Sequence, residues 1–88
     1  MAENKNTKTK KHISKVEKKE YLFQKVSPST WLDIMDEVDE NKSTRRRSLY
    51  TAVLENIVVQ PKMTLDDFDN SAELDDVVVS AMRFQQGK

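Results

Sequence analysis

The chain has 88 residues, of which 36% are hydrophobic and 34% are charged, and its formal net charge is zero. This length allows one domain at most, and because cysteine is absent, no disulfide or cysteine-based metal site can stabilise it. No apolar run approaches the ~20 residues of a membrane span, and no apolar stretch follows the basic N-terminus as in a secretory signal. We therefore expect a cytosolic protein that is stabilised in part by packing against itself or against a partner.

Charge is divided unevenly along the chain. Residues 1–19 contain seven lysines and two glutamates, a net charge of +5, whereas residues 20–88 have a net charge of −5. Residues 1–19 also have too few apolar side chains to offset the entropy of ordering. The sequence therefore predicts a disordered lysine-rich arm at 1–19 and a single mostly helical domain at 20–86.

A short strand and a helix are predicted at the start of this domain. Residues 21–26 are rich in aromatic and β-branched side chains and precede Ser27-Pro28, which is typical of a strand that ends in a turn. Pro28 also suits the first turn of a helix. The next apolar side chains have the spacing of one helical face, and they are Trp31, Ile34, Met35 and Val38.

A second helix is expected after Ser43, whose hydroxyl can accept a free N–H of the first turn. β-Branched residues followed by Pro61 then favour an extended stretch at 57–60, which can pair with residues 21–26. The predicted fold class is mainly α. It is a small three-helix domain with a short two-strand pairing of 21–26 with 57–60, preceded by the disordered basic arm.

The last helix is predicted to follow two N-terminal capping patterns. Thr64 and Asp67 have the spacing of a capping box, and Asn70 and Glu73 repeat that spacing. An apolar stripe follows, and Gly87 lies where the end of a helix is expected. The stripe consists of Leu74, Val77, Val78, Ala81 and Met82.

Catalytic and metal-binding chemistry has little support in the residue pattern. The acidic cluster at 66–76 has the composition of a calcium loop, but a loop that starts at Asp67 places Ala72 where glycine is required and Val78 where the closing glutamate is required. His12 is the only histidine, which argues against a zinc site, and the single glycine excludes a glycine-rich phosphate loop. We expect no enzyme activity, no metal and no cofactor.

Some apolar helical positions are candidates for contact with a partner. The simplest interpretation is that these stripes face the core, although methionine adapts well to varied apolar partner surfaces. Residues 45–47 are three arginines that point in different directions around a helix, so we expect a solvated first turn rather than one patch. The candidate client-binding residues are Trp31, Leu32, Met35, Val78 and Met82.

Residues 58–69, with the sequence VVQPKMTLDDFD, form the most distinctive segment. It resembles a segment of the tail assembly chaperones of long-tailed phages that infect Gram-positive bacteria, in which V-V-x-P-K is followed by a short spacer, D-x-F and an acidic amphipathic helix. The order of predicted elements over residues 20–86 is similar in outline to that family. The matching motif positions are Pro61, Lys62, Asp66 and Phe68.

The resemblance implies a non-catalytic role in virus assembly. Members of the family are thought to coat the helical tape measure protein and keep it soluble while tail tube subunits are recruited. They act in the host cytoplasm and are absent from the mature virion. The family often makes a longer product by ribosomal frameshifting, and residues 86–88 can be encoded by a slippery sequence. The implied partners are the tape measure protein and, through the longer form, the tail tube protein.

Two other functions are compatible with the sequence. A small nucleic-acid-binding regulator would use the lysine-rich arm, and its duplex binding would fall steeply with salt and require residues 1–19. The arm has no aromatic residue for base stacking and the body is acidic, which weighs against nucleic acid. A structural component of the virion would instead be found in purified particles. Self-association is also compatible with the thin apolar core.

Overall fold

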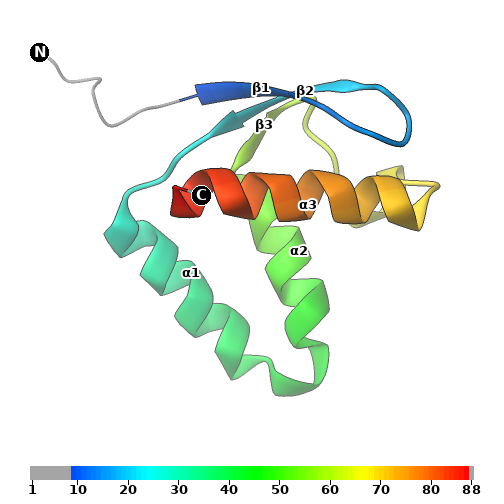
Figure 1. Cartoon of the computed structure of the whole chain (residues 1–88). Helices are drawn as coiled ribbons and strands as arrows, with labels where there is room; N and C mark the ends of the chain where they lie inside the picture. The colour runs from blue at the N-terminus through cyan, green and yellow to red at the C-terminus, as the bar shows by residue number, and fades with distance from the viewer. Residues whose placement is uncertain (1–8, 88) are drawn as a thin grey trace, which may run out of the picture.

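Residues 9–87 are described by the computed structural model, and Figure 1 shows how their helices and strands are arranged. The elements follow the order β1 (Thr9–Ile13), β2 (Glu20–Gln24), α1 (Pro28–Glu40), η2 (Lys42–Thr44), α2 (Arg45–Asn56), β3 (Val58–Gln60), η3 (Leu65–Asp67) and α3 (Ser71–Gln86), where η denotes a 3-10 helix. Helices account for most of these residues, so the predicted mainly α class is confirmed. Within this range no helix has the length and apolar character needed to cross a membrane.

The strands form one antiparallel sheet in the order β1-β2-β3. The predicted pairing of residues 21–26 with 57–60 is confirmed by β2 and β3, in which Phe23 lies opposite Val58. Tyr21 and Phe23 share one face of β2, because alternate residues of a strand point the same way, and both are 1% exposed. In Figure 1 the helices lie on one side of the sheet, so its other face is left without a helical layer from the described residues.

Strand β1 corrects the prediction that all of residues 1–19 are disordered. Thr9–Ile13 pair with β2, with His12 opposite Tyr21. Residues 1–8 of the predicted arm lie outside the described residues. The prediction was wrong for β1 because it considered only local apolar content, whereas this strand is held by a backbone ladder to β2 and by contacts with α3.

The helix termini show which capping signals operate. At the start of α1, Ser27 Oγ accepts the Thr30 backbone N–H at 3.2 Å, as its place before a proline suggests. The prediction that Ser43 caps the second helix is wrong. Ser43 lies inside η2, because the chain tightens into a 3-10 turn before α2 begins, and Thr44 takes the N-cap position without a side-chain hydrogen bond. Gly87, with a φ of 79°, closes α3 in the left-handed conformation, as predicted.

The core lies between the sheet and helices α2 and α3. Its buried side chains are Tyr21, Phe23, Val53, Leu54, Ile57, Val58, Val77, Val78 and Ala81. Helix α1 lies at the edge of this cluster, which its partly buried Trp31 contacts, and it packs along α2, where it buries Ile34 and Val38. In Figure 1 the α1–α2 pair extends away from the sheet, so α1 depends mainly on α2 for its support.

One line of buried side chains along α3 combines apolar and polar contacts. Glu73, Val77, Ala81 and Gln85 are four residues apart and therefore share a face of the helix. Gln85 binds the Val26 backbone twice, since its Oε1 accepts the N–H at 2.8 Å and its Nε2 donates to the carbonyl at 2.9 Å. The apolar middle of this face therefore packs in the core, while its polar ends fix the chain before α1 and the turn after β1.

Candidate partner-binding surface

The five predicted client-binding residues do not form one exposed surface. Val78 is 0% exposed and belongs to the core, so its prediction as a contact residue is wrong for this conformation. Leu32 is 62% exposed on α1. Trp31, Met35 and Met82 are partly buried, and the first and last of them pack against the core. Helical periodicity identifies apolar stripes, but it does not say which parts of them tertiary packing covers.

The four motif residues lie on the chain that returns along α2 after β3. Pro61 directly follows the strand and is exposed, as is Asp66 in η3. Lys62 Nζ donates to the Glu55 backbone carbonyl of α2 at 2.8 Å. Phe68 is partly buried and packs against the core. The motif therefore attaches this segment to α2 through Lys62 and to the core through Phe68, and it leaves the exposed carboxylate of Asp66 between them.

Two capping patterns precede α3, and only the first is a complete box. The Thr64 backbone N–H donates to the Asp67 carboxylate at 2.8 Å, which confirms the first predicted box. Asn70 caps α3, and its Oδ1 accepts the N–H groups of Ala72 at 2.8 Å and Glu73 at 3.4 Å. Glu73, however, is 1% exposed and directs its carboxylate to β2 and the turn before it. For the second predicted box, the cap by Asn70 is confirmed, but the return contact from Glu73 to Asn70 is wrong.

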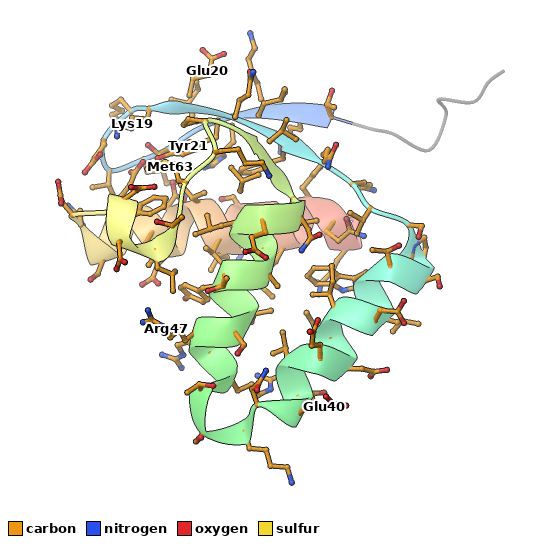
Figure 2. All side chains as sticks on the ribbon, turned by 180° about the vertical axis from the view of Figure 1, so that it is seen from behind. Lys19, Glu20, Tyr21, Glu40, Arg47 and Met63 are labelled. Atoms are coloured by element: carbon orange, nitrogen blue, oxygen red, sulfur yellow. The ribbon has the colours of Figure 1, made fainter. Side chains whose placement is uncertain are left out.

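An open groove lies between α2 and residues 63–74, and we call it the α2 groove. It contains a cavity of about 510 Å³ and an adjoining cavity of about 160 Å³, which share Arg47, Leu65 and Asp66. Figure 2 shows Arg47 projecting from α2 on the side where η3 and the start of α3 lie. The apolar floor of the larger cavity consists of Tyr50, Leu65, Phe68 and Leu74.

The groove floor is partly exposed and is held in place by a hydrogen bond between helices. Tyr50 Oη donates to Asp75 Oδ1 at 2.8 Å, which joins α2 to α3. Burial, and then this hydrogen bond and the carboxylate charge, raise the pKa of Tyr50 above its ordinary value of 10.0. The phenol therefore remains a donor at neutral pH. The floor of the groove therefore consists of half-buried apolar side chains around a phenol that is fixed by its hydrogen bond.

A second polar cluster fixes the turn between β1 and β2 on α3. The Glu73 carboxylate accepts the Tyr21 hydroxyl at 2.8 Å and the Glu17 backbone N–H at 3.1 Å. Burial, followed by the hydrogen bond and the negative charge of Glu73, raises the pKa of Tyr21 well above its ordinary value of 10.0. Tyr21 therefore remains a donor at neutral pH and keeps this buried carboxylate paired.

Asp76 lies one helical turn after Glu73 and binds the same turn. Its Oδ2 accepts the Lys15 backbone N–H at 2.9 Å, and His12 Nε2 lies 3.2 Å from the same oxygen. The His12 ring stacks on Phe23 with 5.2 Å between centroids. The histidine that was predicted to lie in a disordered arm is therefore part of the packed structure. We call Glu73 and Asp76, with these contacts, the hairpin clasp.

Acidification should weaken the hairpin clasp. Burial opposes ionisation of Asp76, but the Lys15 N–H and His12 outweigh it and hold the pKa of Asp76 below its ordinary value of 3.8. A lowered folded-state pKa adds stability above pH 3.8, and this stability is lost as pH falls through the lowered value. Below pH 3.8, the free energy of unfolding should therefore decline more steeply for the wild type than for Asp76→Asn. Equal slopes in denaturant titrations over that range would contradict the clasp.

Sequence reasoning missed both the α2 groove and the hairpin clasp. Arg46 and Tyr50 share a face of α2, but no local pattern indicates that Phe68, eighteen residues after Tyr50, meets them. Glu73 does carry a signal, because it precedes Val77 by four residues and so continues the buried line of α3. Among residues 9–87, no group of three or more His, Cys, Asp or Glu side chains is placed to hold a metal ion.

Comparison with known proteins gives no match to any family model, any curated protein or any solved structure. Function is therefore inferred from the residues of this chain. The most informative of them are those of the α2 groove and of the segment at 58–69, which supplies one of its walls.

Proposed function

We propose that this protein is a tail assembly chaperone of a long-tailed phage. It binds and solubilises the tape measure protein and helps to recruit tail tube subunits, the latter through a frameshifted longer form. It acts without catalysis in the host cell cytoplasm and is absent from the mature virion.

One observation carries this proposal: the segment with the family resemblance forms a wall of the α2 groove. Residues 58–60 complete the sheet as β3, and the following chain places Leu65, Asp66 and Phe68 along the groove. If the residues that resemble the phage family were all buried, the resemblance would be informative about the fold alone. Here part of it lines an open apolar surface, and surface loops on a rigid scaffold are where binding residues concentrate.

The surface outside the groove suits a protein that keeps an apolar client in solution. A chaperone of this kind needs accessible apolar surface for the client and a charged exterior that resists aggregation of the complex. Residues 9–87, which include β1 and its lysines, have twelve basic and fourteen acidic side chains and so a net charge of −2. Helix α1 contributes an acidic exposed face made of Asp33, Asp36, Glu37, Asp39 and Glu40.

Co-expression with a tape measure fragment should raise the soluble fraction of that fragment several-fold, because the chain would cover apolar surface that otherwise aggregates. The measurement compares the fragment in the supernatant and in the pellet after lysis, with an unrelated acidic protein of similar size as the control. If the fragment precipitates equally with and without this chain, the chaperone function is wrong.

A nucleic-acid-binding role has less support from the contacts of β1 and its turn. The lysines there are Lys10, Lys11, Lys15, Lys18 and Lys19. Lys11 pairs with Glu20 at 3.3 Å, and Lys19 pairs with Glu17 at 3.6 Å, so part of this charge is neutralised locally. The ring of His12 is stacked inside the fold. Residues 9–19 therefore provide no free aromatic platform on which a base could stack.

A further inference from the structure

The two walls of the α2 groove carry opposite charges. Arg46 and Arg47 project from α2, whereas Asp66 and Asp69 stand on the facing wall, at η3 and before α3. All four side chains are exposed. In Figure 2 the Arg47 side chain extends beside the groove rather than into the core. A ligand lying in the cavity of about 510 Å³ would therefore meet positive charge on one side and negative charge on the other, whereas the smaller cavity has the exposed Glu55 on its α2 side.

The charges of the two walls do not pair with each other. The neighbouring Arg45 pairs with Asp39 at 2.8 Å, on the side of α1. Within residues 9–87, no ion pair joins Arg46 or Arg47 to an aspartate of the opposite wall. Because the apolar floor separates the arginines from the aspartates, both remain available to charged side chains of a bound partner. Charge complementarity between the walls and the partner then sets the partner's orientation.

The floor between the walls suits the apolar face of a helix. Tyr50, Leu65, Phe68 and Leu74 line the cavity of about 510 Å³, which continues into the cavity of about 160 Å³. Grooves of this kind bind amphipathic helices through apolar side chains spaced i, i+3, i+4 and i+7. An extended peptide would instead need a free sheet edge, and no strand residue lines either cavity of this groove.

We propose, on the basis of the function proposed above, that the α2 groove binds an amphipathic α-helix of the partner polypeptide. The acidic flank of that helix lies on Arg46 and Arg47, and its basic flank lies on Asp66 and Asp69. Because turning a helix end for end exchanges its flanks, the divided walls select one N-to-C direction of the bound helix. The groove thus recognises which flank of a helical client is acidic and which is basic, rather than one particular sequence.

Two designed helical peptides of identical composition test this proposal. Both have leucines along one face; the split-flank peptide has glutamate on one flank and lysine on the other, whereas the mixed-flank peptide has both residues on both flanks. Fluorescence anisotropy with the full chain should show that the split-flank peptide binds about tenfold more tightly. Equal affinities, or no binding of either peptide, would overturn the proposal.

Charge reversal on the walls gives the matched protein test. Arg46→Glu with Arg47→Glu makes both walls acidic and should weaken binding of the split-flank peptide about tenfold. Adding Asp66→Lys and Asp69→Lys exchanges the walls, and the peptide should regain wild-type affinity by binding in the opposite direction. The four side chains are exposed, so circular dichroism should show each variant folded. A four-residue variant that binds no better than the two-residue variant would contradict the selection of direction.

A charge exchange outside the groove separates this mechanism from a general effect of charge. Lys11 and Glu20 form an exposed ion pair on the sheet, and Lys11→Glu with Glu20→Lys keeps the net charge of the chain. This variant should bind the split-flank peptide as the wild type does. If it loses affinity as much as the Arg46→Glu, Arg47→Glu variant, the groove does not carry the interaction.

The other occupant to consider is a second copy of the chain. Sedimentation of the free protein would then show a dimer that is absent for the Arg46→Glu, Arg47→Glu variant, and that result would overturn the proposal of a partner helix.

The experiments distinguish a failure of the proposed groove from a failure of the proposed function. Peptide binding without solubilisation of the tape measure fragment would contradict the chaperone function, whereas solubilisation without peptide binding would contradict the groove.

Discussion

Truncation of Phe23 to alanine is expected to leave much of the protein unfolded at physiological temperature. Phe23 is 1% exposed in the central strand, and its ring lies 5.2 Å from that of His12 and 6.4 Å from that of Phe84. Loss of a buried phenylalanine side chain costs about 3–5 kcal/mol. Small domains have a free energy of unfolding that starts at about 5 kcal/mol, so this one substitution removes most of it. Denaturant unfolding followed by circular dichroism measures the loss.

Leu32→Ala is the matched control for this prediction. Leu32 is also a large apolar residue but is 62% exposed, so its truncation should change the free energy of unfolding by less than about 0.5 kcal/mol. If Phe23→Ala cost no more than Leu32→Ala, the core between the sheet and the helices would be placed wrongly.

Replacement of Glu73 by alanine should produce the second large effect. It leaves the Tyr21 hydroxyl and the Glu17 backbone N–H without the acceptor that both now share. A buried donor without a partner costs about 1–3 kcal/mol, so Glu73→Ala should lower the free energy of unfolding by about 2–4 kcal/mol. Faster hydrogen exchange at the Glu17 amide should accompany the loss, because the turn between β1 and β2 is released.

Glu73→Gln provides the control, since it keeps one acceptor oxygen and nearly the same shape. It should cost about half as much as Glu73→Ala or less. A buried carboxylate can also be a net burden, because its desolvation opposes the hydrogen bonds that it makes. A Glu73→Ala protein as stable as the wild type would therefore show that the hairpin clasp does not stabilise the fold.

Local signals explain why most of the helical fold could be predicted. The apolar stripes of α1 and α3 follow the helical period, and Ser27 and Gly87 mark a helix start and a helix end. The pairing of β2 with β3 followed from two short apolar segments that each needed a partner. The start of α2 was misplaced at Ser43 because the sequence does not distinguish an N-cap from the 3-10 turn that precedes the helix.

Strand β1 could not be predicted because its stability is not local. Its five residues include two lysines and only one aliphatic side chain, Ile13, which is 52% exposed. The contacts that hold it reach β2 across the turn and Asp76 near the other end of the chain. A prediction based on the apolar content of residues 1–19 cannot include either contact, because both involve residues outside that range.

The sequence predicted separate segments of the candidate site but not the groove that they form together. The sequence indicated solvated arginines at 45–47 that form no single patch and a distinctive segment at 58–69. The structure instead places Arg46 and Arg47 together beside part of that segment in one groove, whereas Arg45 pairs with Asp39. The client-binding prediction instead selected Val78, because buried and open apolar stripes have the same periodicity. Which stripe remains open is decided by the packing of α2 against η3 and α3, and that packing joins residues distant in sequence.

The most direct measurement is the soluble fraction of a tape measure fragment co-expressed with the wild-type chain and with the Arg46→Glu, Arg47→Glu variant. The wild type should keep the fragment in the supernatant and co-purify with it, whereas the variant, folded by circular dichroism, should lose most of this effect. Equal solubilisation by both would contradict the role of the α2 groove. A fragment that pellets to the same extent with the wild type as without any chaperone would contradict the proposed function itself.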